Sequence, residues 1–387
     1  MEFIYYAPLR VVFAKNSISK ISSYTARNGN RVLLVTGRRH LKENGVLDTV
    51  LDSFKRNSKI ETVVLFDKAE ENPDVELVHK ACDLMIKDSL NVVVAIGGGS
   101  AMDLAKATSI SARQKRPIEE IMQSGDINIM KAYPIICSPT TSGSGSEVTK
   151  YAVINNNKEK TKKAIGSETL YPVVSLIDST LTYTMNKETI ANTGFDALSH
   201  AIEAYTSKSS SPITDAYCRQ AISLIGENLQ KAYETKDKKA MDNMSLASML
   251  AGMALNVGRA SLPHAMEHVL SAYNKNLPHG LGLSVIMTPF VKRACLCNKE
   301  KFADIAYLLG EDVSNMSLED AANKSIDAIE KIKHTIGLNK TLSQLGFDKE
   351  IIKKALHDTF WTMAHGIDNS PCEFSMKDVL EMYLEVL

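Results

Sequence analysis

LNVVVAIGGGSAMDLAK, residues 90–106, sets the architecture of the N-terminal part of the chain, because an apolar run enters three glycines and then a helical segment. Comparable apolar runs rich in Val and Ile end in turn-forming residues, as buried strands do. Amphipathic segments separate them. This alternation predicts an α/β fold with a mostly parallel sheet and helices on both faces. The further predicted strands are RVLLVTG (31–37), IETVVLFD (60–67), YPIICSPTT (133–141) and VVSLID (173–178).

The second half of the chain has helical periodicity. In ITDAYCRQAISLIGENLQKAYE, the apolar residues Ile213, Tyr217, Ala221 and Leu224 keep spacings of three and four. We therefore expect an α/β domain over residues 1–184 and an all-helical domain over 185–387. The segment NNNKEKTKK (155–163) is expected to form an exposed basic loop.

Composition narrows the class of protein. The 387 residues include 45 basic and 45 acidic side chains, which gives no support for nucleic acid or an acidic membrane as the main partner. No secretory signal or membrane-spanning apolar run is visible. The six cysteines are scattered, and Cys295-x-Cys297 has no second pair nearby to complete a metal site. We expect a soluble, cytoplasmic protein with reduced cysteines.

Two loops rich in small residues follow neighbouring predicted strands. Gly97-Gly98-Gly99-Ser100 opens a helix, whose free N–H groups and positive dipole end suit a pyrophosphate. It is neither the Gly-x-Gly-x-x-Gly fingerprint nor a P-loop, and a tight turn is the alternative. SPTTSGSGSEVT (138–149) supplies hydroxyl donors, although alone it reads as a solvated loop. Together the two loops favour a dinucleotide.

A third pattern indicates a metal. In GFDALSHAIEAY (194–205), Asp196 and His200 are four residues apart and share one helix face. His264, His268 and His279 follow within a short stretch. A carboxylate with imidazoles suits Fe²⁺, Zn²⁺, Co²⁺ or Ni²⁺. Any single histidine is more often a hydrogen-bonded core residue, but the group favours a metal.

The ordered set GGGSAMDLAK, SPTTSGSGSEVT, GFDALSHAIEAY, PHAMEHVLSAY and LPHGLGLS resembles the iron-containing, or group III, alcohol dehydrogenases, and the likeness extends over essentially the whole chain. The resemblance implies an α/β nucleotide-binding domain, an all-helical metal-binding domain and a site in the cleft between them. It implies metal ligands at Asp196, His200, His264 and His279. His268 would lie near the nicotinamide and the substrate without being a ligand.

The same resemblance implies the cofactor contacts. The glycine turn would take the pyrophosphate, and the serine-rich loop would line the cofactor. Lys162 matches a cofactor-contacting lysine, although Lys163 adjoins it. The full expected set is Gly37, Arg38, Arg39, Asn72, Gly97, Gly98, Gly99, Ser100, Asp103, Thr140, Thr141, Ser144, Gly145, Thr149 and Lys162.

One departure from the family pattern bears on the cofactor. NAD-preferring members often carry an Asp just after the first strand of the nucleotide domain, where this chain has Gly37 followed by Arg38 and Arg39. A glycine leaves room for a 2′-phosphate, and a guanidinium can bind it in a bidentate manner. We therefore expect NADP(H) in preference to NAD(H). Two solvated surface arginines are the alternative.

The resulting expectation is a metal-dependent oxidoreductase that transfers a hydride between a small primary alcohol, diol or aldehyde and NADP(H), with aldehyde reduction in the cell. Fe²⁺ is the expected ion and Zn²⁺ the alternative. His268 is the candidate proton relay. Glycerol-dehydrogenase-like polyol oxidation, a dehydroquinate-synthase-like lyase, a metal-dependent hydrolase without nucleotide and a non-catalytic sensor are the rival functions. A homodimer or larger assembly is expected.

Overall fold

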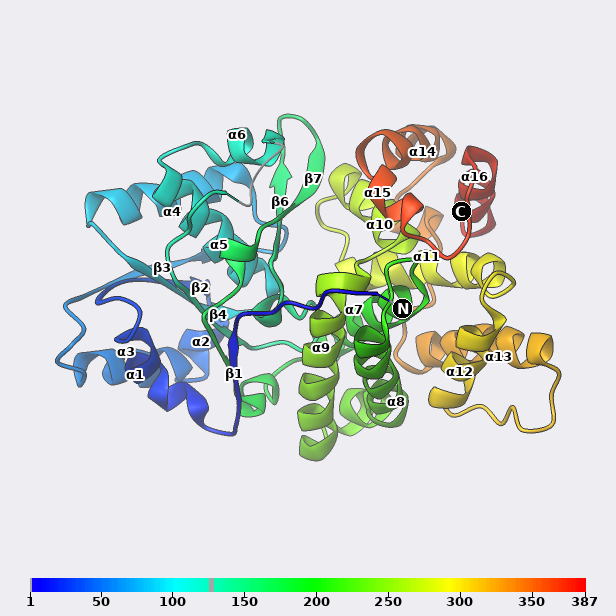
Figure 1. Cartoon of the computed structure of the whole chain (residues 1–387), viewed down its shortest axis with the longest axis horizontal. Helices are drawn as coiled ribbons and strands as arrows, with labels where there is room; N and C mark the ends of the chain where they lie inside the picture. Colours follow the sequence, from blue (N-terminus) through cyan, green and yellow to red (C-terminus); the bar gives the residue numbers. More distant parts are fainter. Residues whose placement is uncertain (1, 125–128) are drawn as a thin grey trace. The chain divides into compact units, whose positions relative to one another are not determined.

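The computed structural model describes residues 2–124 and 129–387 (Figure 1). The chain forms two compact units. The α/β unit comprises residues 6–141 and 145–184, and the helical unit comprises residues 2–5, 142–144 and 185–387. The predicted fold class is confirmed. Residues 2–5 and 142–144 cluster with the helical unit, although the sequence assigned them to the first domain.

A parallel sheet forms the centre of the α/β unit. Within the described residues it has six strands in the order β1-β8-β5-β4-β2-β3, and each neighbouring pair is parallel. The five predicted strands are present, and β1 is an addition, too short to stand out in the sequence. The strands are β1 (Arg10–Phe13), β2 (Arg31–Gly37), β3 (Thr62–Ala69), β4 (Val92–Gly97), β5 (Ile135–Pro139) and β8 (Val174–Ile177).

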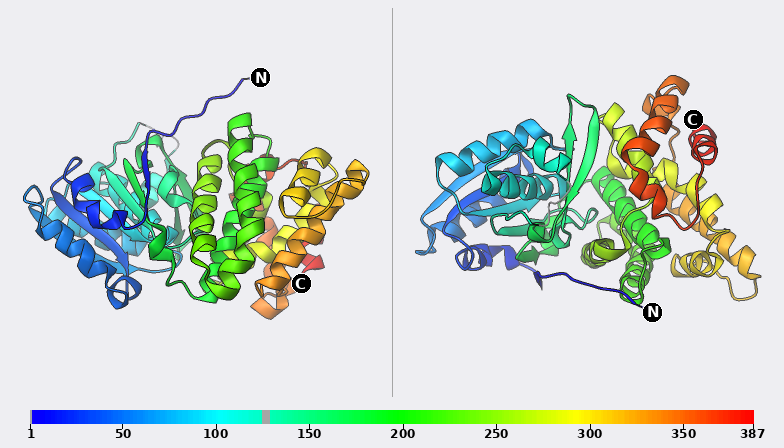
Figure 2. Two further views of the ribbon diagram at one scale, coloured as in Figure 1. Left: turned by 90° about the horizontal axis from the view of Figure 1, so that it is seen from below. Right: turned by 45° about the horizontal axis from the view of Figure 1, so that its top comes forward.

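Helices cover both faces of this sheet (Figure 2). Along β2, Leu33 and Val35 pack into the hydrophobic cluster on one face, whereas Val32 and Leu34 pack into the cluster on the other. The near-continuous apolar runs are explained by this two-sided burial. One face carries α1 (Ile21–Thr25), α2 (His40–Glu43) and α3 (Val46–Lys55); the other carries α4 (Val75–Lys87), α5 (Gly99–Gln114) and α6 (Ile118–Gln123). Short helices are η1 (Ser17–Lys20), η2 (Ser146–Val148), η3 (Glu168–Leu170) and η4 (Ser179–Thr182).

An antiparallel hairpin replaces most of the expected basic loop at 155–163. Strands β6 (Tyr151–Asn156) and β7 (Thr161–Gly166) pair throughout their length. The expectation of an exposed loop is therefore wrong at both ends of that segment, and only the turn between the strands remains. The reason is that Ile154 and Ile165, which flank the polar run, are drawn into the core. Lys162, in the same hairpin, is also buried.

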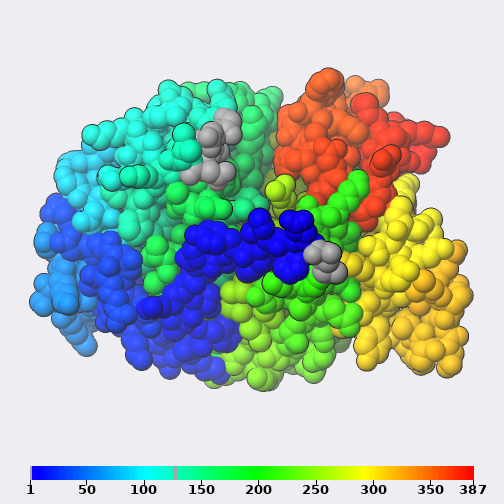
Figure 3. Space-filling view, viewed as in Figure 1, coloured from blue at the N-terminus to red at the C-terminus, as the bar shows by residue number. Residues whose placement is uncertain are grey.

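The second unit is built from helices joined by loops. None of its helices is long and apolar enough to cross a membrane. At its N-terminal segment, dark blue in Figure 3, Ile4 is exposed while the Tyr5 ring lies 5.9 Å from that of Tyr217. The helices are α7 (Lys187–Thr206), α8 (Pro212–Thr235), α9 (Lys238–Gly258), α10 (Leu262–Tyr273), α11 (His279–Ala294), α12 (Lys299–Leu308), α13 (Leu318–Thr335), η5 (Ser343–Leu345), α14 (Lys349–Thr362), α15 (Ala364–Asp368) and α16 (Met376–Glu385).

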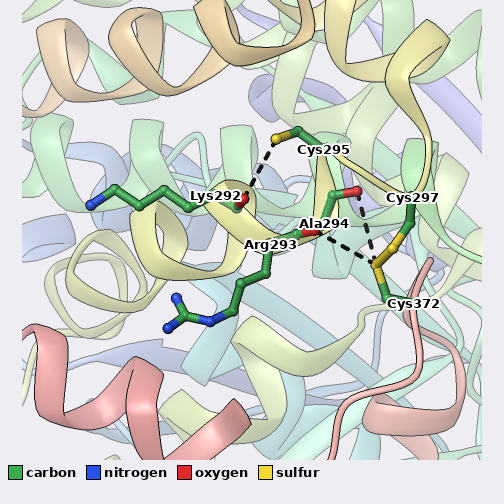
Figure 4. The surroundings of a disulfide bond; sticks show 6 residues. All are labelled: Lys292, Arg293, Ala294, Cys295, Cys297 and Cys372. Atoms are coloured by element: carbon green, nitrogen blue, oxygen red, sulfur yellow. Dashed lines mark hydrogen bonds between the residues drawn. A yellow bond between two sulfur atoms is a disulfide. The ribbon is translucent and has the colours of Figure 1, made fainter. Parts of the chain in front are cut away.

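A disulfide joins Cys297 to Cys372 (Figure 4), so the expectation that the cysteines are all reduced is wrong. The two residues are 75 positions apart, but their Cα atoms lie 5.9 Å from each other. Cys297 follows α11 and Cys372 precedes α16, and these two helices pack together. Cys295 remains a buried thiol.

We expect this disulfide to stabilise the helical unit. Replacing both Cys297 and Cys372 by Ser should lower the free energy of unfolding by about 2–4 kcal/mol, because the bond closes a long loop in the unfolded chain. Denaturant unfolding with and without reductant measures this. The double variant should not respond to reductant. Alkylation of all six cysteines in the unfolded, non-reduced protein would contradict the bond.

Candidate functional site

Helix α7 supplies the first two side chains of the site. It begins at the Asn186 cap, whose side chain accepts a hydrogen bond from the backbone N–H of Thr189. Asp196 and His200 lie one turn apart on this helix, and both are buried. The distance from His200 Nδ1 to Asp196 Oδ1 is 3.6 Å. The predicted helix and the predicted juxtaposition of these two side chains are both present.

Helices α10 and α11 bring His264 and His279 to the same carboxylate oxygen. The Nε2 atoms of His264 and His279 each lie 3.6 Å from Asp196 Oδ1. The ligand atoms of these three residues all fall within 4.8 Å of one another. The four side chains expected to bind a metal are thus gathered around one atom, although 83 positions separate the first from the last.

The unsatisfied atoms at this point fit a cation. Asp196 Oδ1, His200 Nδ1 and His264 Nε2 are buried and make no hydrogen bond to any residue that the structure describes. Buried polar atoms normally have partners, and orphaned ones call for an explanation such as an ion. One carboxylate and three imidazoles form a donor set suited to Fe²⁺ or Zn²⁺.

Gly280 allows α11 to approach α7. A Cβ atom at this position would collide with the backbone carbonyl of Asn192, which lies on α7 one turn before Asp196. Any other residue would push the start of α11, and with it His279, away from the carboxylate. The glycine after the third histidine therefore has a packing role that spacing alone did not reveal.

Electrostatics keep Asp196 negatively charged. Burial opposes its ionisation, but the imidazoles of His200 and His279 outweigh burial and hold its pKa well below the usual range. Burial lowers the pKa of His200 to about 4. Burial also opposes the charge on His264, but the Glu203 and Asp196 carboxylates outweigh it and raise the pKa of His264 to about 10. The site therefore holds two ionised carboxylates, Asp196 and Glu203, whose pKa values are both lowered beside the imidazoles.

Two buried glutamates in this region were missed by the sequence analysis. Glu203 contacts Nδ1 of His264, and Glu267 contacts Nδ1 of His279. A signal for Glu203 was available, because it lies seven residues after Asp196 and so continues the same helix face. Glu267 carries no comparable signal, since a single Glu in a helix is usually solvated.

His268 lies beside the same cluster. It follows His264 by one turn of α10, and its ring centroid is 5.5 Å from that of His279. It is buried, and one of its ring nitrogens lies within 4.8 Å of ligand atoms on Glu267 and His279. The structure places this histidine next to the four expected ligands rather than elsewhere in the core.

Most of the residues expected to bind the nucleotide follow the carboxyl ends of three strands: Gly37 ends β2, Gly97 ends β4, and Thr140 follows β5. These strands are neighbours in the sheet, and β3 and β4 lie on opposite sides of β2, which is the arrangement that forms a ligand crevice in open α/β sheets. The backbone N–H of Thr140 donates to Gly97 O at 3.0 Å, which joins the two loops. The N-cap of α5 is Gly98, which has no side chain to bond the first N–H groups of the helix. Those N–H groups are therefore available to an anion.

A buried lysine that the sequence analysis overlooked holds the serine-rich loop in place. Lys106 Nζ donates to the carbonyl oxygens of Ser146 at 2.6 Å, Thr149 at 2.9 Å and Tyr151 at 2.8 Å. Asp103 accepts from Ser146 Oγ at 2.7 Å. Asp103 and Thr149, both expected cofactor contacts, therefore already have hydrogen-bond partners within the protein. Their part in cofactor binding stays a prediction.

The remaining expected cofactor residues are spread over the two units. Arg38 pairs with Glu70, which directly follows β3, and both side chains are exposed. Asn72 lies in the same turn with a φ of 52°. Gly145 adopts a φ of 60°, which favours glycine. Ser144 clusters with the helical unit.

Comparison with known proteins gives concordant matches. Residues 8–179 match the family model described as "Iron-containing alcohol dehydrogenase", and residues 190–387 match "Fe-containing alcohol dehydrogenase family, C-terminal". The chain is 37% identical over 350 residues to a 1,3-propanediol dehydrogenase of Klebsiella pneumoniae, with 89% of each chain covered. It is 30% identical to an NADPH-dependent butanol dehydrogenase of Clostridium saccharobutylicum, covering 89% of this chain and 87% of the relative. A crystal structure of 1,3-propanediol oxidoreductase is similar at a TM-score of 0.93 and 31% identity over 100% of both chains.

Proposed function

The chain belongs to the iron-containing alcohol dehydrogenase family, and from this membership we propose that it transfers a hydride between NADP(H) and a small primary alcohol, diol or aldehyde. The observation that carries the proposal is the convergence of His200, His264 and His279 on Asp196 Oδ1, each at 3.6 Å. We assign these four residues as ligands of a divalent ion, Fe²⁺ by family and Zn²⁺ as the alternative.

When bound, the metal ion supplies a Lewis acid for the alcohol or carbonyl oxygen, and the nicotinamide supplies the hydride acceptor or donor. The protein contributes the rest. Asp196 provides the negative charge that retains the ion, and the imidazoles complete the ligand set. The turn at Gly97–Ser100 and the N-terminus of α5 bind the pyrophosphate. Packing around His264 and His268 limits the access of water to the ligand set, since both rings are buried.

Relatives guide the choice of substrate. One relative is a 1,3-propanediol dehydrogenase and another a butanol dehydrogenase, so we propose a short primary alcohol or diol, with reduction of the aldehyde as the cellular direction. Glycerol oxidation is the rival within the same fold. A cytoplasmic location and a homodimer or larger assembly remain proposals.

His268 is the proposed proton relay between substrate oxygen and solvent. His268→Ala should lower kcat by about 10²–10⁴-fold and flatten the pH dependence of the rate, because a positioned general acid–base group contributes that much. His365→Ala, a change at an exposed histidine of α15, is the control and should leave both unchanged. Turnover and a pH profile like those of the unaltered enzyme would rule out the relay.

The reaction itself is tested by metal replacement without oxygen. We expect metal-stripped protein to be inactive, and Fe²⁺ or Zn²⁺ added separately to restore oxidation of reduced nicotinamide with butanal or the aldehyde of 1,3-propanediol. Loss of the Fe²⁺-dependent rate in air would identify iron. Equal activity before and after stripping would overturn the metal assignment. NADPH binding without turnover on these aldehydes or on glycerol would overturn the proposed reaction but not the nucleotide site.

The cofactor preference rests on the end of β2. The names of relatives record NAD for a methanol dehydrogenase and NADPH for the butanol dehydrogenase, so family membership does not decide it. We propose NADP(H), because a Cβ at Gly37 would meet only Ala69 O at 3.8 Å and Arg38 and Arg39 follow. Glu70 opposes this preference, since its carboxylate pairs with Arg38 and would repel a 2′-phosphate.

Two substitutions test this preference in opposite directions. Gly37→Asp should shift kcat/KM toward NADH. Glu70→Gln should lower the KM for NADPH by up to about fivefold, the size of an exposed ion pair, and leave the KM for NADH unchanged. Glu61→Gln is the control, because Glu61 pairs with Arg31 at the other end of β2. A wild-type preference for NADH, or the same change with both cofactors, would refute the role of Arg38.

A further inference from the structure

We infer that Glu203 and Glu267 position the ligand nitrogens of His264 and His279 by accepting the Nδ1 proton of each ring. This inference rests on the metal site proposed above. Both glutamates are 0% exposed, and neither belongs to the expected ligand set. Fully buried glutamates are rare unless they have partners, so the partners of these two carboxylates are informative.

Glu203 reaches His264 from helix α7. Its Oε1 lies 2.5 Å from His264 Nδ1, while His264 Nε2 lies on the far side of the ring, 3.6 Å from Asp196 Oδ1. A carboxylate that accepts from Nδ1–H fixes the tautomer in which Nε2 carries the lone pair. Asp196, His200 and Glu203 share one face of α7, so a single helix supplies two ligands and the group that orients a third.

The second oxygen of Glu203 ties helix α10 to α7. Glu203 Oε2 accepts from the backbone N–H of Ser261 at 2.7 Å, from Ser261 Oγ at 3.0 Å and from the backbone N–H of His264 at 3.4 Å. Ser261 is the N-cap of α10, but its own side chain does not cap the helix. Glu203 therefore caps α10 in its place, at the helix end that favours negative charge.

Glu267 approaches His279 in a similar way, although this pair is a close ionic contact and not a hydrogen bond like that of Glu203. Its Oε2 contacts His279 Nδ1, and its Oε1 accepts from Ser271 Oγ one turn further along α10. The Nε2 of His279 then faces Asp196 Oδ1 at 3.6 Å. Gly282 makes room for this carboxylate, because a Cβ there would lie 2.8 Å from Glu267 Cγ. Two independent contacts thus orient two ligands of the same set.

A rival interpretation takes Glu267, His268 and His279 as ligands of a second ion, since atoms of these residues also lie within 4.8 Å of one another. The geometry of His279 argues against it. Its Nδ1 faces Glu267 and its Nε2 faces Asp196, so a second ion would displace the contact that orients the ring. The positioning role requires one ion per chain, whereas the rival requires two.

The test is metal affinity rather than activity. Metal-free wild type, Glu203→Gln and Glu267→Gln would be titrated with Zn²⁺ against a competing chelator. Each variant should bind about 10–100-fold more weakly, the range measured when outer-shell partners of histidine ligands are removed. Glu330→Gln is the matched control in the same unit, because Glu330 pairs with Lys333 at 2.6 Å and accepts from Thr288, neither of which is an assigned metal ligand. Its affinity should equal that of wild type.

If the two glutamates only stabilised the fold, replacing them would lower the unfolding temperature of the metal-free protein. The positioning role predicts otherwise. The amide oxygen of Glu203→Gln can still accept from the N–H groups of α10, and the amide oxygen of Glu267→Gln can still accept from Ser271 Oγ. The metal-free variants should therefore unfold at temperatures near that of wild type. In zinc-loaded wild type, ¹⁵N-histidine NMR should show Nδ1–H at His264 and His279.

Three results would overturn the inference. The first is a Zn²⁺ affinity within about threefold of wild type for both variants. The second is weaker binding accompanied by a lower unfolding temperature in both metal-free variants. The third is a stoichiometry of two Zn²⁺ ions per chain. Wild type that binds no Zn²⁺ or Fe²⁺ would instead overturn the metal site on which the inference rests.

Discussion

A carboxylate buried among imidazoles is the constraint on which the arrangement of α7, α10 and α11 depends. Asp196 Oδ1 is buried and lacks a hydrogen bond from the described residues. The imidazole nitrogens of His200 and His264 that face it are 3.6 Å away. A buried charge without partners costs several kcal/mol, so the site is stable only where compensating charge is close. The close packing at Gly280 and the cap that Glu203 provides both serve to bring that charge within reach.

The sequence was sufficient for the features that local patterns encode. Runs of Val and Ile located five strands, because strands buried on both faces have few polar residues. The i, i+4 spacing and the concentration of histidines identified the residues that gather around Asp196. These are properties of single segments or of residue types that are rare in a chain, and both can be recognised without knowing which segments meet.

What the sequence did not reveal depends on contacts between distant segments. Lys106 and Glu267 look like ordinary helix-surface residues, and only the tertiary structure shows that both are fully buried. The cysteines of the disulfide are too far apart for spacing to pair them. The hairpin β6–β7 was hidden by its lysines, since the apolar positions that anchor it lie outside the polar run.

The division of labour between the units has an evolutionary consequence. The side chains assigned to the metal lie within one contiguous span of the helical unit, whereas Gly37, Arg38 and Glu70 lie at strand ends of the α/β unit. Mutations at the positions proposed to select the cofactor therefore leave every assigned metal ligand unchanged. Under the proposed cofactor assignment, substitutions at a strand end are enough to change which nicotinamide cofactor is used, and the family includes members named for either nucleotide.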